Sequence, residues 1–208
     1  MKKALKISIE ISFLGVMFLF TSFNVFAQPT VIEPGDSSVD PALVNLGKFT
    51  WGLRFDKNED RLISVQRNNQ EITVETRETR KGLEKSKQTV VLNAKTLEII
   101  RQSYTDEDRS YNLQYGARVK GVRTDFETNK KENIDAVVTG KHFNSLSLPY
   151  VISTLPLSLD YRVTIPVMRL NNTWQPEYVR YRIVAISEQE KFSCLSGPRT
   201  VWKVTVHE

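Results

Sequence analysis

Residues 109–115 read RSYNLQY, and this short run shows how the chain folds. Its large side chains, Tyr111, Leu113 and Tyr115, alternate with serine, asparagine and glutamine. Successive side chains of a β-strand point to opposite faces, so this pattern is typical of a strand with one buried and one solvated face. We therefore expect a strand here, with the three large side chains directed into a core.

The same alternation recurs along most of the chain. β-branched and aromatic residues again occupy one side of the runs at residues 72–77, 161–167 and 177–186. Polar segments with the composition of turns lie at residues 56–60, 67–70, 105–109, 128–133 and 170–174. Short strands at such spacing predict an antiparallel meander. The expected fold is mainly β, a curved antiparallel sheet or an incomplete barrel.

One segment departs from the strand period. In SLSLPYVISTLPL, residues 145–157, four apolar side chains share one stripe of a helix: Leu148, Val151, Ile152 and Leu155. Ser147 is a suitable N-cap, and Pro156 cannot continue a helix. These features predict one short helix, at about 148–155, that covers the apolar side of the curved sheet.

The N-terminal residues have the three parts of a secretory signal. Lysines at positions 2, 3 and 6 precede an apolar run at 11–20, and Val25 and Ala27 have the small-residue spacing of a cleavage site. The sequence predicts a signal peptide at 1–27, a flexible leader rich in proline, glycine and serine at 28–47, and a single β-rich domain at 48–208. Export to the periplasm or the extracellular space follows from this prediction.

Composition narrows the classes of partner. The formal net charge is +5, with both signs interspersed, which argues against nucleic-acid binding. Cys194 is the single cysteine, so the domain has no internal disulfide and must be held together by its core. After signal cleavage no apolar run is long enough to cross a bilayer as a helix.

Three segments, taken in order, carry a family resemblance. They are NAKTLEII at 93–100, LPYVISTLPL at 148–157 and CLSGPRTVWKV at 194–204. Over residues 48–206 the chain resembles a bacterial family of exported proteins known only as a domain of unknown function. The resemblance implies a fold similar to that of the lipoprotein carriers LolA and LolB, an open barrel with helical cover. Members of that family usually continue past the Trp-x-Val strand with a further hairpin. We therefore expect either that the domain is truncated at its C-terminus or that its sheet ends with an exposed edge strand.

Residue types with catalytic or metal-binding potential do not form a recognisable motif. His142 follows a glycine and a lysine in an expected loop, and His207 is next to the C-terminal residue. The run Asp56-x-Asn58-x-Asp60 begins like a calcium loop, but Arg61 stands where that loop needs glycine. The sequence predicts no catalytic residue, no metal ligand and no cofactor.

The apolar faces are the remaining candidates for a site. Seven side chains are predicted to line a lipid-sized cavity or else simply to form the core: Tyr111, Leu113, Tyr115, Val163, Ile165, Tyr181 and Ile183. In the first case the helix is a lid, and in the second its side chains fill the space. The sequence favours a non-enzymatic envelope protein that binds an apolar or amphiphilic ligand, with a lipid, a lipoprotein or another envelope protein as partner. A structural or protein-interaction module with a filled core and a hydrolase of envelope glycans stay open as alternatives.

Overall fold

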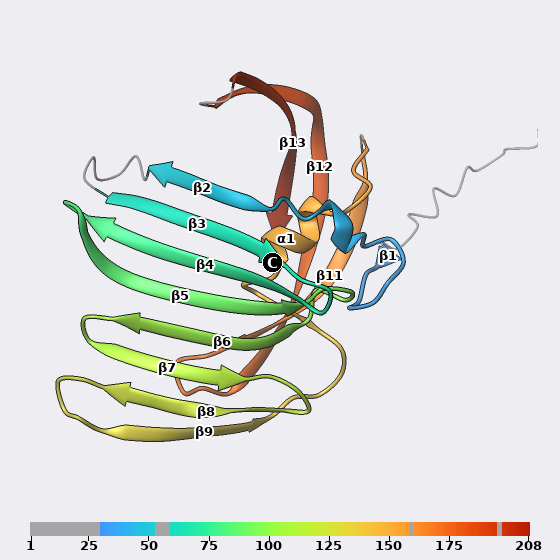
Figure 1. The fold of residues 1–208 in the computed structure, drawn as a ribbon. Coiled ribbons are helices and arrows are strands. Elements are labelled where there is room, and N and C mark those ends of the chain that lie inside the picture. The colour runs from blue at the N-terminus through green and yellow to red at the C-terminus, as the bar shows by residue number, and fades with distance from the viewer. Residues whose placement is uncertain (1–29, 53–58, 159, 195–196) are drawn as a thin grey trace, which may run out of the picture.

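The computed structural model describes residues 30–52, 59–158, 160–194 and 197–208. Two antiparallel-rich sheets make up this part of the chain (Figure 1). The predicted signal peptide at 1–27 and most of the turn at 56–60 lie outside the described residues. No helix among the described residues combines the length and the apolar character needed to cross a membrane.

The larger sheet is an eight-stranded meander in which every strand pairs with its neighbour in the chain. Each alternating run is long enough to form one ladder, and short polar turns reverse the chain between ladders. Its strands are β2 (Gly47–Gly52), β3 (Glu59–Arg67), β4 (Glu71–Arg80), β5 (Leu83–Asn93), β6 (Ile99–Asp106), β7 (Arg109–Gln114), β8 (Arg118–Asp125) and β9 (Lys131–Val137).

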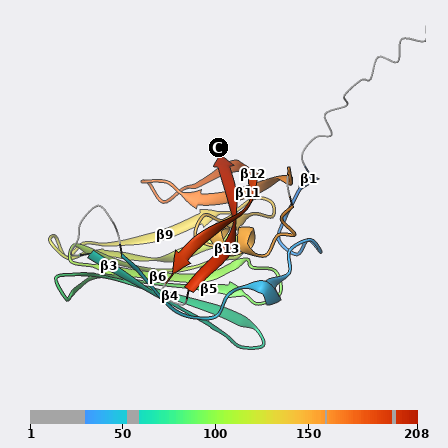
Figure 2. The same ribbon diagram turned by 90° about the horizontal axis from the view of Figure 1, so that it is seen from above.

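The smaller sheet crosses one face of the larger one. Its antiparallel part is formed by β11 (Arg162–Leu170), β12 (Pro176–Cys194) and β13 (Gly197–His207). The free edge of β11 pairs in parallel with two short strands, β1 (Thr30–Val31) near its start and β10 (Phe143–Asn144) near its end. Figure 2, seen from above, shows β11 and β12 on one side of the larger sheet.

The single α-helix of the described residues, α1 (Leu148–Ser153), lies between the sheets. It is shorter than predicted, and Ser147 does not cap it through its side chain. Instead the Ser147 hydroxyl donates a hydrogen bond to the backbone oxygen of Asn144, 2.8 Å away. Pro149 occupies the first turn, where its missing N–H leaves no helical bond unmade.

The main core lies where the two sheets and the helix meet. Fully buried side chains come from both sheets, including Ile72 and Leu92 from the larger one and Ile165 and Ile183 from the smaller one. A second, smaller cluster joins Leu113, Val119, Ile134 and Met168. The predicted class is therefore confirmed: the fold is mainly β, with one short covering helix and open curved sheets that do not close into a barrel.

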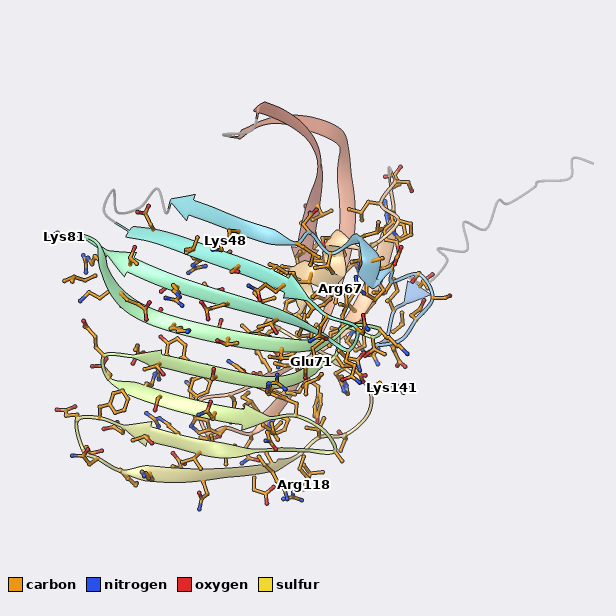
Figure 3. All side chains as sticks on the ribbon, in the orientation of Figure 1. Lys48, Arg67, Glu71, Lys81, Arg118 and Lys141 are labelled. Atoms are coloured by element: carbon orange, nitrogen blue, oxygen red, sulfur yellow. The ribbon has the colours of Figure 1, made fainter. Side chains whose placement is uncertain are left out.

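The segment predicted as a flexible leader, residues 28–47, differs from that expectation from Thr30 onward. Ile32, Val39 and Val44 are buried in the main core, and a short 3-10 helix forms at Pro41–Leu43. Arg67, labelled in Figure 3, donates hydrogen bonds of 2.8 Å to the backbone oxygens of Pro41 and Ala94. Proline and glycine gave this segment the composition of a linker, but its three well-spaced apolar residues bury enough surface to hold it in place.

Candidate functional site

The inner face of the larger sheet, the face toward the smaller sheet, changes its chemistry along the strands. Cross-strand register places three rows of side chains on this face. The apolar row consists of Val65, Val74, Val90, Gln102, Leu113, Gly121 and Ile134. The middle row lies two residues away from the apolar row on each strand. It consists of Ile63, Thr76, Gln88, Tyr104, Tyr111, Arg123 and Glu132. The charged row contains Arg61, Glu78, Ser86, Asp106, Arg109 and Asp125.

A cleft of about 440 Å³ opens between the sheets where the apolar row gives way to the middle and charged rows. Strands β6 to β8 form one wall, and the segment after β10 together with the β11–β12 hairpin forms the other. The lining side chains are Gln102, Arg109, Tyr111, Leu113, Tyr115, Arg123, Asn144, Ser145, Leu146, Arg169, Leu170, Asn171, Asn172 and Trp174. This lining combines aromatic rings, three leucines, amides and three arginines, and it includes no carboxylate.

Three aromatic rings form a contiguous cluster at the cleft. Tyr104 and Tyr111 are stacked with ring centroids 5.3 Å apart, and Trp174 meets Tyr111 edge-on at 5.2 Å. The guanidinium carbon of Arg109 lies 6.0 Å from the Tyr104 ring, and that of Arg123 lies 5.9 Å from the Trp174 ring. These separations are within the range of cation–π attraction, which orients both guanidinium groups.

Trp174 reaches this cluster from the tip of the β11–β12 hairpin. Its φ of 60° is in the left-handed region, which costs a residue with a side chain about 1–2 kcal/mol. The turn is fixed by Asn171, whose Oδ1 accepts hydrogen bonds from the backbone N–H groups of Thr173 and Gln175 at 2.9 and 3.0 Å. Trp174 keeps this conformation because its ring packs against the Leu113 cluster across the cleft.

A hydrogen-bonded network fixes the deep end of the cleft. Tyr115 donates its hydroxyl proton to Oε1 of Gln102, and Nε2 of Gln102 donates to the Tyr111 hydroxyl, both at 2.8 Å. Burial raises the pKa of Tyr111 and Tyr115 above the usual value, so both hydroxyls stay neutral at physiological pH. Burial and a hydrogen bond to Asp106 raise the pKa of Tyr104 to about 12. The network therefore offers neutral hydrogen-bonding groups with fixed orientations.

The arginines of the cleft differ in how tightly they are paired. Arg169 is bound by Glu177 at 2.8 Å and by Glu208 at 3.3 Å. Arg109 lies 3.5 Å from Asp106, and Arg123 lies 3.7 Å from Glu132 and 3.9 Å from Asp125. The last three separations exceed the usual length of an N–H···O hydrogen bond, and Nε of Arg123 is buried without a hydrogen-bond partner.

The two aspartates near these arginines are satisfied by other donors. Asp106 accepts from the backbone N–H groups of Asp108 and Arg109 at 2.9 and 2.7 Å. Burial raises its pKa, but hydrogen bonds from the Tyr104 hydroxyl and these N–H groups outweigh burial and keep the pKa below the usual value. Asp125 accepts from the hydroxyl and the backbone N–H of Thr128, which lowers its pKa. Both carboxylates are therefore stabilised without a close ion pair.

A larger hollow, of about 620 Å³, lies over β5 to β8 and has a different character. Most of its lining faces the other way from the cleft, for example Thr89, Ser103, Asn112 and Lys120. The larger sheet forms its floor, and no described residue outside this sheet contributes to its lining. The cleft has walls from both sheets and a set of converging polar groups, so it is the better candidate for a site.

The structure divides the seven predicted cavity residues between two places. Tyr111, Leu113 and Tyr115 line the cleft. The other four belong to the main core, with Val163, Ile165 and Ile183 fully buried and Tyr181 packed against them.

The four residues of the predicted lid also pack in the main core. Leu148, Val151 and Leu155 are buried members of it, and Ile152 packs at its margin. Leu155 lies two residues beyond the end of α1. The helix therefore fills the space between the sheets, and the cleft is at a different place, beyond Asn144 and Leu146.

The two histidines are not among the residues that line the cleft. His142 packs 4.5 Å from the Tyr178 ring, and its Nδ1 has no hydrogen-bond partner. His207 is exposed at the end of β13, and Cys194 ends β12. Among the described residues there is no group of three or more histidine, cysteine, aspartate or glutamate side chains arranged to hold a metal ion.

Sequence reasoning missed most of the cleft. Trp174 lies in a segment with the composition of a turn, Arg109 lies where a predicted turn meets a predicted strand, and Arg123 lies on a strand that shows no clear alternation. A bulky tryptophan inside an asparagine-rich turn was the one available signal, since large aromatic side chains are uncommon in such turns.

The protein belongs to the mainly β class. Two open, curved sheets pack face to face around one short helix, and a cleft opens at their junction. The chain belongs to the family described as Protein of unknown function (DUF3108), whose model matches residues 45–208. Neither the curated proteins nor the solved structures contain a significant match to the chain.

Proposed function

We propose that this chain is an exported, non-enzymatic envelope protein that binds a small amphiphilic ligand in the cleft between its sheets. The observation that carries the proposal is the mixed lining of the cleft, with the rings of Tyr111 and Trp174 beside the polar side chains of Gln102 and Asn172. Its volume of about 440 Å³ is within the range of small-molecule sites in proteins.

The position of the cleft favours an amphiphilic ligand over a purely apolar one. The main core around Ile165 and Ile183 is filled by the side chains of α1, so an acyl chain has no room there. The cleft instead presents apolar contacts from Leu113, Leu146 and Leu170 beside hydrogen-bonding groups. A ligand with one apolar and one polar part matches this surface without leaving buried polar groups unpaired.

The proposal of a binding role also rests on the position and protonation of the groups that could be chemically reactive. His142 lies against Tyr178 and outside the cleft lining, and Tyr111 and Tyr115 stay neutral in the physiological range. General-base chemistry needs a group with a pKa near the working pH next to the reacting atoms. The groups that line the cleft are better suited to holding a ligand than to transforming it.

Mass spectrometry of the purified chain tests this proposal. The full chain, produced in a bacterium that exports it, is expected to carry an amphiphile that is seen as an adduct under native conditions and identified after extraction. Ser145→Trp should fill the cleft without removing a core side chain and should abolish the adduct, whereas Leu83→Ala, at the exposed start of β5, should retain it. Equal adducts in all three proteins, or none in the unaltered chain, would refute binding in the cleft.

A further inference from the structure

We infer that the polar part of this ligand carries an oxyanion of the phosphate type and that Arg109 and Arg123 bind it. This inference rests on the proposed function, because it assigns the chemistry of one end of the cleft. The two arginines are diagonal neighbours on the same face of β7 and β8, since Arg109 pairs with Asp125 and Arg123 with Tyr111. Diagonal side chains of this kind are close enough for two guanidinium groups to contact one tetrahedral anion.

Both guanidinium groups have hydrogen-bonding capacity to spare. Their nearest carboxylates are 3.5 Å or more away, whereas several arginines elsewhere in the structure have a carboxylate within 3 Å. Arg101, for example, makes two hydrogen bonds of 2.8 Å with Glu71, which is labelled in Figure 3. An arginine holds five N–H donors in a fixed plane, and this plane suits phosphate oxygens better than a single lysine ammonium does.

The neighbouring carboxylates do not need these arginines. Asp106 and Asp125 are held by backbone and hydroxyl donors of their own turns. Arg109 and Arg123 can therefore turn toward a ligand without leaving Asp106 or Asp125 unsatisfied, and the half-exposed Glu132 side chain remains in contact with water. The unpaired Nε of Arg123 means that this movement breaks no hydrogen bond at that atom.

The aromatic rings add a reason for the arginines to point toward the cleft. Arg109 lies against Tyr104 and Arg123 against Trp174, so the rings limit the directions that the guanidinium groups adopt. A pre-oriented donor loses less conformational entropy when a ligand binds. The result is a pair of oriented guanidinium groups beside the apolar and amide part of the cleft, while the nearby carboxylates are not part of the lining. This division matches an amphiphile with an anionic headgroup.

Binding of two probes that differ in their headgroups tests the inference. Dodecyl phosphate and dodecyl maltoside, below their micellar concentrations, are titrated into the full chain freed of co-purified ligand, and Kd is measured by calorimetry. We expect dodecyl phosphate to bind about tenfold more tightly or better, since hydrogen bonds to charged groups exceed neutral ones by this much. Arg109→Gln and Arg123→Gln should each remove most of this preference, because each should weaken binding of dodecyl phosphate more than binding of dodecyl maltoside.

Arg118→Gln is the matched control. Arg118, labelled in Figure 3, is on the same strand as Arg123 but on the opposite face, where it pairs with Asp135. Equal affinity for the two probes, or a preference that survives both cleft substitutions, would overturn the inference and leave the proposed function standing. Failure of both probes to bind would instead count against the cleft as a binding site. Displacement of dodecyl phosphate by inorganic phosphate would show that the oxyanion itself is recognised and would support the inference.

Discussion

Gly121 on β8 occupies a position that has no room for a side chain. A Cβ atom built there would lie 1.9 Å from the backbone oxygen of Asn112 and 2.8 Å from Cδ2 of Leu113. Gly121 pairs with Leu113 on β7 and with Ile134 on β9, in the apolar row beside the cleft. The absence of a side chain lets the backbone of β8 approach that of β7, and it keeps Tyr111 and Arg123 in register on the neighbouring row.

Replacement of Gly121 by alanine is expected to destabilise the protein. The contact with a backbone oxygen is relieved only if β7 and β8 move apart, so we expect the free energy of unfolding to fall by about 1–3 kcal/mol. Gly116→Ala is the matched control, because nothing lies within 4 Å of its Cβ position. Urea unfolding of both variants gives the comparison, and a Gly121→Ala protein as stable as the control would show that the strands tolerate the extra atom.

Individual elements were predictable to the extent that local periodicity determines them. The alternating runs at 72–77, 161–167 and 177–186 all lie within or at the start of observed strands, because the side-chain period of a strand is a local property. β5 was not recognised, since Val90, Val91 and Leu92 are consecutive apolar residues. Val91 faces away from the core, where it pairs with Thr73 on β4 and with Arg101 on β6. It is nevertheless buried, because the Arg101–Glu71 ion pair crosses β5 at this place.

The helix was predictable from its apolar stripe, but its role depends on what packs around it. Val151 is fully buried in the main core, so Val151→Ala should lower the free energy of unfolding by about 2 kcal/mol through lost burial and a small cavity. Ser153→Ala, at an exposed position at the end of α1, should change it by less than about 0.5 kcal/mol. Thermal or urea unfolding separates these outcomes. Equal stability of the two variants would mean that the helix does not contribute to the core.

At the scale of the whole molecule, the sequence indicated a β fold but not the way its two sheets combine. Alternation assigns one apolar face to each strand, but it does not indicate which other element packs against that face. The rows of the inner face, and therefore the cleft, arise from cross-strand register and from the docking of the β11–β12 hairpin. For the same reason Tyr111 and Val163 were grouped in one predicted cavity, although the structure places them in separate clusters.

The N-terminal segment is the strongest test of how the two sheets are joined. Residues 30–44 pair with β11 of the smaller sheet, are bound by Arg67 of the larger sheet, and bury Ile32, Val39 and Val44. A chain that begins at Asn45 should therefore be less stable than one that begins at Thr30, by roughly 2–4 kcal/mol after the entropy of ordering the segment is set against its burial. Denaturant midpoints measure this difference, and coincident midpoints would support the original expectation of a loose leader.

The parallel pairing of Thr30 with Val163 also constrains the order of folding. Each ladder of the larger sheet joins strands that follow one another, so those hairpins close short loops and can form early. Strand β1 has no docking edge until β11, encoded far downstream, has been put in place. The first described residues of the chain are therefore among the last to reach their native contacts, and a nascent or partly refolded molecule would leave the edge of β11 open to an intruding strand from another copy.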